Sequence, residues 1–206
     1  MPQRGLQLIN LGLNPKKPAT KWDRNILDSL RIPIKSAHIK AGCWLTWKKP
    51  DKGNYKLNID GSFKNNMGTA GGIVRDDEGN PVTFFWGKVT ADDPESTEVE
   101  AINMGIDQCN KLGIHVTEIE TDSTMAIRAF QGKINNPNLT YRSRRNSINS
   151  RKIYLVRREQ NAVADALAKF ARNNEECASN NFQVLPSEIK RLIFHDRIGL
   201  QVYRKG

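Results

Sequence analysis

The sequence predicts a mixed α/β fold in which helices flank a five-stranded sheet, made of three antiparallel hairpin strands and two further strands. Three observations support this prediction. β-like runs alternate with short turns between residues 55 and 89. The hydrophobic period changes from two to 3.6 residues near Asp93, and strand and helix patterns then alternate as far as residue 172. The order β-β-β-α-β-α-β-α is typical of a mixed sheet with helices on its faces.

The first three strands are predicted at residues 55–60, 70–75 and 82–89. In the first, Leu57 and Ile59 point to one face of the sheet, and Asp60 points to the other. We expect this strand to end at Asp60, because Gly61 permits a turn that most residues resist. Glycine- and asparagine-rich turns at residues 65–68 and 76–80 separate the three strands.

The following helix is predicted to begin at Pro94, with Asp93 as its N-cap, and to end before Gly113. The later elements are a strand at residues 115–121, a helix at 123–130, a strand at 153–156 and an alanine-rich helix at 162–172. Asn161 stands at the N-cap position of the last helix.

The chain is expected to have three parts. Residues 1–46 form a basic linker or extension, which fits the end of an upstream polymerase region. Residues 47–175 form the α/β domain, and residues 176–206 form a tail that contains a short amphipathic helix at 185–193.

The net charge of +10 is unevenly distributed: the segment 128–158 contains nine basic residues and no acidic one. A solvated basic surface and a polyanionic partner, most simply nucleic acid, are both compatible with this pattern. No apolar run is long enough for a membrane span, and the N-terminus lacks a signal-peptide core, so we expect an intracellular protein of the nucleus or cytoplasm. The three scattered cysteines are expected to be reduced.

Four acidic residues occupy positions that packing alone does not require: Asp60, Glu98, Asp122 and Asp165. Each has an ordinary explanation, as a turn former, a helix N-terminal charge or a helix surface residue. Their convergence at one place would favour another role, because gathered carboxylates repel one another and raise one another's pKa. Divalent cations with oxygen ligands, Mg²⁺ above all, are the usual resolution.

The ordered motifs resemble the ribonuclease H fold in its plant form, the reverse-transcriptase-like domain of plant retroelements and their domesticated relatives. The matching segments are Trp47 to Gly53, Lys56-Leu57-Asn58-Ile59-Asp60-Gly61-Ser62, Ala70 to Gly79, Glu98 with Ala101, Ile102 and Gly105, Glu120-Thr121-Asp122-Ser123, and Arg158-Glu159-x-Asn161-x-x-Ala164-Asp165-x-Leu167-Ala168. The first two segments together form the family's opening motif; each of the resulting five motifs is weak alone, and the five in order are specific. The resemblance covers residues 47–171 and extends more loosely to the C-terminus.

The resemblance implies endonucleolytic hydrolysis of the RNA strand of an RNA·DNA hybrid. Asp60, Glu98, Asp122 and Asp165 would be the catalytic residues and the ligands of two Mg²⁺ ions, for which Mn²⁺ can substitute. Nucleic-acid contacts are expected from Ser62, Asn66, Arg142, Arg144 and Arg145. The protein would act as a monomer away from membranes, alone or in association with a reverse transcriptase.

Three features depart from the family pattern. Active relatives commonly carry a histidine that helps proton transfer and product release, and Leu155 stands at that position. The asparagine that contacts substrate before the helix glutamate is missing, since Pro94 and Glu95 occupy that region. The helix before the fifth strand is shortened over residues 139–152. Three functions therefore stay open: a hybrid nuclease with slowed turnover, a nucleic-acid-binding module with little or no catalysis, and a non-functional retroelement fragment.

Overall fold

The computed structural model describes residues 20–31, 42–143 and 151–205. The chain divides into two units, residues 1–43 with 205–206 and residues 44–204. In the first unit, α2 (Lys21–Ser29) begins with a capping box formed by Thr20 and Asp23. Among the helices of the described ranges, none is long and apolar enough to cross a membrane.

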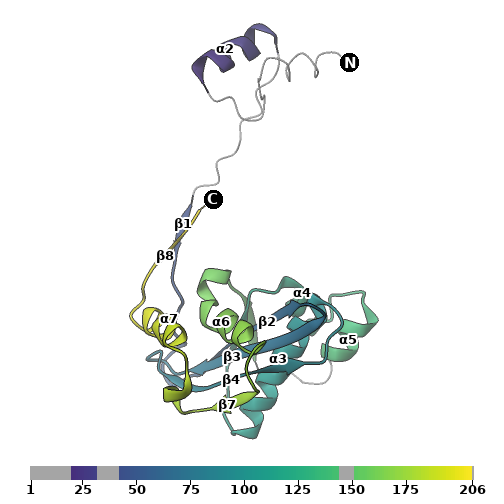
Figure 1. The fold of residues 1–206 in the computed structure, drawn as a ribbon, viewed down its shortest axis with the longest axis vertical. Coiled ribbons are helices and arrows are strands. Elements are labelled where there is room, and N and C mark those ends of the chain that lie inside the picture. The colour runs from purple at the N-terminus through teal and green to yellow at the C-terminus, as the bar shows by residue number, and fades with distance from the viewer. Residues whose placement is uncertain (1–19, 32–41, 144–150, 206) are drawn as a thin grey trace. The chain divides into compact units, whose positions relative to one another are not determined.

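The second unit is built on a six-stranded sheet with the order β6-β5-β2-β3-β4-β7 (Figure 1). Its strands are β2 (Lys56–Lys64), β3 (Met67–Arg75), β4 (Pro81–Val89), β5 (Glu118–Thr121), β6 (Lys152–Leu155) and β7 (Cys177–Ser179). β2, β3, β4 and β7 pair antiparallel in that order, whereas β5 and β6 run parallel to β2. This arrangement confirms the predicted mixed fold of three hairpin strands and two further strands. Two short strands, β1 (Cys43–Leu45) and β8 (Val202–Arg204), form a separate pair.

Helices cover both faces of the sheet. They are α3 (Pro94–Lys111), α4 (Thr124–Phe130), α5 (Pro137–Ser143), α6 (Ala162–Phe170) and α7 (Ser187–Arg197), with short 3₁₀ turns η1 (Arg158–Gln160) and η2 (Phe182–Val184). One core contains Leu57 and Ile59 with the apolar side of α3. The other contains Ile73 with the apolar residues of α6 and α7. Each face of the sheet therefore has its own hydrophobic core.

The predicted start of α3 is confirmed. Asp93 is the N-cap and its side chain accepts a hydrogen bond from the Ser96 N–H, while Pro94 is the first helical residue. The helix ends at Lys111, and Gly113 follows with a φ of +65°.

The prediction that the first strand ends at Asp60 was wrong. β2 continues through Gly61 to Lys64, and the turn lies at Asn65 and Asn66, whose φ angles are +52° and +55°. Gly61 is needed for close packing and not for a turn, because a Cβ there would lie 3.0 Å from the backbone of Glu98. At Gly61, the backbone of β2 therefore packs directly against the backbone of α3.

Two further differences come from tertiary contacts. β7 was not predicted, because three residues without apolar alternation become a strand only by pairing with β4, Phe85 opposite Ala178. Asn161 occupies the N-cap position of α6, but its side chain makes no capping bond and instead donates to the Ile59 carbonyl. The predicted helix in the C-terminal part is present as α7, with Ile189 and Ile193 buried.

Candidate metal centre

The strand register brings Asp60 to Asp122. β5 lies parallel to β2, with Glu118 beside Lys56 and Glu120 beside Asn58. Because side chains alternate along a strand, the next residues on this face are Asp60 in β2 and Asp122 just after β5. Pairing of β5 with β2 stops at Asn58, which leaves the neighbouring part of β2 open to another element.

Glu98 reaches this open place from the second turn of α3. Its carboxylate Oε2 accepts a hydrogen bond from the Gly61 N–H at 3.1 Å, so the residue after Asp60 fixes the glutamate. Gly68 is equally tight against α3, because a Cβ there would lie 3.0 Å from the Thr97 hydroxyl. The small residues of β2 and β3 therefore let α3 approach closely enough for Glu98 to meet Asp60.

Three of the four predicted carboxylates converge. Asp60, Glu98 and Asp122 each offer an oxygen, and these oxygens lie within 4.8 Å of one another. The Asp60 side chain is almost completely buried, with 3% of the residue exposed, while Glu98 and Asp122 are half-buried. The cluster faces outward only through its two half-buried members.

Burial and mutual repulsion dominate the electrostatics of this cluster. Burial, followed by the charges of Glu98 and Asp122, raises the pKa of Asp60 to about 9. Burial, followed by the charge of Asp122, raises the pKa of Glu98 to about 8, although the Gly61 hydrogen bond opposes this shift. A divalent cation would remove both the repulsion and the desolvation penalty, and carboxylate oxygens are the ligands that Mg²⁺ prefers. The residues present therefore fit a magnesium or manganese ion.

The fourth predicted carboxylate, Asp165 of α6, is held by cations of the chain. Its Oδ1 accepts from Arg158 Nη2 at 2.6 Å, and its Oδ2 accepts from Lys169 Nζ at 2.5 Å. Burial alone would raise the pKa of Asp165, but the hydrogen bonds from Lys169 and Arg158 outweigh it and hold this pKa below its usual value. Asp165 lies close enough for its charge to contribute to the raised pKa of Asp60, yet it is outside the cluster of three.

The predicted nucleic-acid contacts occupy different environments. The Ser62 hydroxyl accepts a hydrogen bond from Arg172 Nη2, and Asn66 lies exposed in the turn between β2 and β3. Arg142 is engaged inside the protein, where it pairs with Glu100 at 3.0 Å and donates to the Thr90 carbonyl at 2.7 Å. Arg144 and Arg145 lie outside the described residues. A role of these five residues in nucleic-acid binding stays a prediction.

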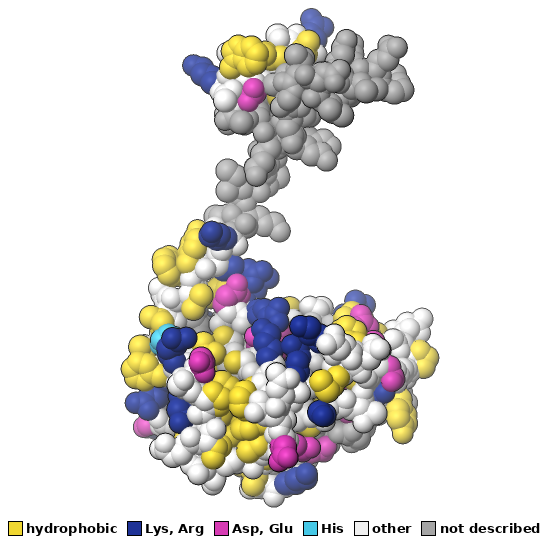
Figure 2. Space-filling view, in the orientation of Figure 1, with side chains coloured by type: hydrophobic (Ala, Val, Ile, Leu, Met, Phe, Trp, Pro, Cys, Tyr) yellow, Lys and Arg dark blue, Asp and Glu magenta, His cyan; other side chains and the backbone are white. Residues whose placement is uncertain are grey.

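Leu155, which the family resemblance predicts to replace a histidine of active relatives, lies near Asp122 of the acidic cluster. It is 54% exposed and lines a cavity of about 570 Å³ together with Asp122 and Thr124. Three arginines line the same cavity: Arg157, Arg158 and Arg204. Figure 2 shows Lys and Arg side chains gathered in the region of α6. The acidic cluster therefore opens onto a basic surface at Asp122, and the apolar side chain of Leu155 cannot carry a proton there.

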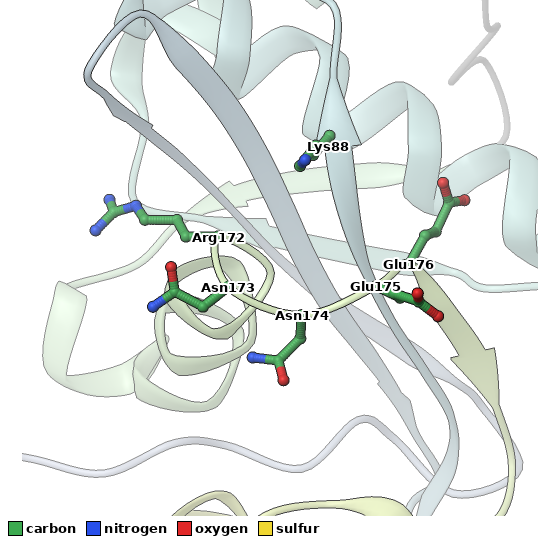
Figure 3. Close-up of a pocket in the computed structure, with 6 residues that line it drawn as sticks. All are labelled: Lys88, Arg172, Asn173, Asn174, Glu175 and Glu176. Carbon is green, nitrogen blue, oxygen red and sulfur yellow. The ribbon is translucent and has the colours of Figure 1, made fainter.

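A second cavity, of about 430 Å³, lies where α6 runs on towards β7. It is lined by Lys88, Arg172, Asn173, Asn174, Glu175 and Glu176. Figure 3 shows these side chains pointing in different directions and not towards a common point. This cavity is therefore no second catalytic constellation.

Residues near the site that were not predicted are Arg158 and Lys169 as partners of Asp165, and Arg172 as the partner of Ser62. A signal for Lys169 exists, because it stands four residues after Asp165 on one helix. Arg158 and Arg172 could not be assigned from spacing alone, because their contacts depend on how η1 and the end of α6 pack.

The segment 58–171 matches the family model described as reverse transcriptase-like. A comparison with curated proteins found no match. Among solved structures, RNase H1 from the halophilic archaeon Halobacterium salinarum NRC-1 is similar, with a TM-score of 0.53 and 23% identity over 58% of this chain and 97% of that chain. LC11-RNase H1, isolated from compost by a metagenomic approach, gives a TM-score of 0.52 and 22% identity over 57% of this chain and 94% of its own. The structure of the same protein in complex with an RNA/DNA hybrid gives a TM-score of 0.51 and 20% identity over 57% of this chain and 96% of that chain.

These structural likenesses establish the ribonuclease H-like fold. Since the matched segment spans more than half of the 206 residues, the chain belongs to the reverse transcriptase-like family.

Proposed function

We propose that this protein is a divalent-metal-dependent nuclease that hydrolyses the RNA strand of RNA·DNA hybrids. The observation that carries the proposal is the convergence of Asp60, Glu98 and Asp122, whose oxygens lie within 4.8 Å of one another. An uncompensated cluster of this kind is unfavourable in a purely structural role. The fold is that of RNase H1 proteins, one of which was solved with an RNA/DNA hybrid, and this supports the same substrate class here.

The residues of the cluster and of the neighbouring hairpin have different roles in this proposal. Asp60, Glu98 and Asp122 would hold Mg²⁺, and the hydrogen bond from the Gly61 N–H keeps the Glu98 carboxylate next to Asp60. Bound Mg²⁺ would activate the attacking water and stabilise the leaving 3′ oxygen. Ser62 and Asn66, on the same hairpin, would contact the nucleic-acid backbone, and 2′-hydroxyls would distinguish the RNA strand.

Turnover is expected to be slow. Leu155 cannot accept or donate a proton, and loss of one general acid or base typically lowers a rate by about 10²–10⁴-fold. The ion pairs of Asp165 with Arg158 and Lys169 also compete with a metal ion for its carboxylate.

The proposal is tested by incubating the full chain with an end-labelled RNA·DNA hybrid and either Mg²⁺ or Mn²⁺. We expect metal-dependent cleavage within the RNA strand, abolished by Asp60→Asn and by Glu98→Gln. Glu188→Gln is the matched control, because Glu188 lies exposed in the first turn of α7 and outside the cluster. Cleavage that is unchanged in Asp60→Asn, or absence of cleavage with either metal, would contradict the proposal.

A second function is a nucleic-acid-binding module with little or no catalysis. Its support is the neutralisation of Asp165 by Arg158 and Lys169, together with Leu155 at the histidine position. Salt-sensitive binding of a hybrid with no hydrolysis in either metal would select this function over the first.

A further inference from the structure

A row of buried polar side chains lies directly behind the metal centre. On the face of β2 that carries Asp60, the preceding residues are Asn58 and Lys56, both buried. Their neighbours on β5 are Glu120 and Glu118, and Arg75 of β3 stands opposite Lys56. The sheet thus places two cations and two carboxylates in the layer next to Asp60 and Asp122.

The Asn58 amide is the centre of this network. Its Oδ1 accepts from Arg75 Nη2 at 2.7 Å and from Trp47 Nε1 at 3.1 Å. Its Nδ2 donates to Glu120 Oε2 at 2.8 Å and to Asn161 Oδ1 at 3.2 Å. All the donors and both acceptor positions of the amide are therefore used. The hydrogen bond between Asn58 and Glu120 links β2 to β5. Asp60 and Asp122 each follow two residues after one of these partners.

The same network reaches the helix that carries Asp165. The Asn161 amide donates to the Ile59 carbonyl at 2.8 Å, so the residue just before Asp60 is bonded to the N-cap position of α6. Lys56 Nζ completes the network on the other side, where it donates to Glu120 Oε1 at 2.8 Å. The elements carrying Asp60, Asp122 and Asp165 are therefore joined by one set of hydrogen bonds.

Arg75 connects this set to the C-terminal helix. Its side chain is fully buried, and its guanidinium lies over the Trp47 ring at 3.4 Å. Nη1 donates to Asp196 of α7 at 2.6 Å, while Nη2 holds Asn58. A planar guanidinium can make these two bonds at once, and a lysine could not reproduce this geometry. Arg75 therefore connects the Asn58 amide to a carboxylate that lies 121 residues further along the chain than Arg75 itself.

We propose that Arg75 and Asp196 are positioning residues of the metal centre: α7, through this ion pair, fixes the Asn58 amide that spaces the strands carrying Asp60 and Asp122. The inference rests on the proposed function, since it assumes that these aspartates bind a divalent cation. Residues that hydrogen-bond a metal ligand directly commonly change metal affinity or activity by about 10–100-fold when they are removed. Arg75 and Asp196 act through Asn58 and the two strands instead, so we expect an effect no larger than that.

The test is calorimetric titration of Mn²⁺ into the full chain, without nucleic acid, accompanied by thermal unfolding of each variant. Asp196→Asn is expected to weaken Mn²⁺ binding measurably, by no more than about 10–100-fold. Glu188→Gln is the matched control, because Glu188 lies exposed in the first turn of the same helix, and we expect it to bind Mn²⁺ as the wild type does.

Asp196→Asn leaves Arg75 buried without its charged partner and could unfold the protein. The double variant Arg75→Gln with Asp196→Asn removes both charges, so we expect it to unfold at a temperature closer to that of the wild type. Its Mn²⁺ affinity is expected to stay low, because no guanidinium then holds the Asn58 amide. A purely structural role predicts the opposite, that affinity returns together with stability.

Either folded variant binding Mn²⁺ as tightly as the wild type would overturn the inference while leaving the proposed function intact. Failure of both variants to unfold cooperatively would also overturn it, since the pair would then be a general determinant of folding. A wild-type chain that binds no divalent cation would overturn the proposed function, and this inference with it.

Discussion

Asp60 illustrates how much a single residue depends on its surroundings. Sequence motifs predict that it is a metal ligand, and the prediction that it is the last residue of a strand was wrong. The structure places it inside β2, where burial and two neighbouring carboxylates raise its pKa to about 9. That position could not be read from Gly61, because a glycine in a sequence does not reveal whether it turns the chain or admits a helix. Asp165 shows the same limit, since its pairing with Arg158 depends on tertiary structure.

The raised pKa of Asp60 predicts how stability depends on pH. An aspartate with a pKa near 9 when folded and 3.8 when unfolded binds more protons in the folded state between these values. The protonated Asp60 therefore favours the folded state at low pH. This favourable contribution to the free energy of unfolding of the metal-free protein is lost as pH rises through that window. Mg²⁺ needs the deprotonated carboxylates, so we expect the increase in Tm on adding Mg²⁺ to be larger at pH 9 than at pH 6.

Differential scanning fluorimetry at several pH values, with and without Mg²⁺, checks this prediction. In the metal-free Asp60→Asn variant the contribution is absent, so its stability relative to the wild type should rise with pH. An Mg²⁺-induced shift in Tm that is equal at pH 6 and pH 9 would be inconsistent with the raised pKa.

Secondary-structure elements were predictable where the signal is local. The three hairpin strands and α3 follow from alternation, from the turn residues and from the Asp93–Pro94 start, and all are confirmed. β7 and the extension of β2 beyond Gly61 were missed, because each forms by pairing with a partner strand that no local pattern encodes. The polar network behind the metal centre was missed for the same reason: Asn58, Arg75 and Asp196 meet only in the folded sheet.

The contact between β2 and α3 gives a prediction for Gly61→Ala. The added Cβ would lie 3.0 Å from backbone atoms of Thr97 and Glu98, which cannot move independently of the helix. We expect a loss of about 1–3 kcal/mol in the free energy of unfolding, together with weaker Mn²⁺ binding because Glu98 is displaced. Chemical denaturation and calorimetry measure the two effects.

The control for this substitution is Gly53→Ala. Gly53 has a φ of +77°, and a Cβ added there would meet no other residue within 4 Å, so the cost of the substitution comes from backbone conformation alone. The Mn²⁺ affinity of the Gly53→Ala variant should equal that of the wild type. Gly61→Ala with normal Mn²⁺ affinity would mean that the close contact does not set the position of Glu98.

At the scale of the whole molecule, a net charge of +10 coexists with a site made of carboxylates. The positive and negative charges are separated in space: arginines line the cavity beside Asp122, whereas the carboxylates lie in the cluster itself. α7 links the C-terminal part of the chain to the same centre through Asp196. The family and the fold were identifiable from ordered motifs, and so was the convergence of Asp60, Glu98 and Asp122, whereas these long-range links were not.

The charge distribution predicts strongly salt-dependent binding of nucleic acid. Each phosphate neutralised by a Lys or Arg contributes about −0.9 to the slope of log K against log salt concentration on duplex DNA. For the Asp60→Asn variant, we expect the affinity for a hybrid to fall steeply between about 50 and 200 mM salt, the range over which such losses are large. Fluorescence anisotropy measures this affinity. Replacing Arg157 by Gln should reduce the slope, whereas an affinity insensitive to salt would exclude a phosphate-contacting surface.

The central claim is that Asp60, Glu98 and Asp122 form a divalent-metal centre, and electron paramagnetic resonance of Mn²⁺ tests it most directly. Titrating Mn²⁺ into the full chain gives the number of bound ions from the signal of the free ion. We expect saturable binding by the wild type and by Glu188→Gln, and loss of that binding in Asp60→Asn. Equal binding by the wild type and Asp60→Asn, or no binding by the wild type, would contradict it.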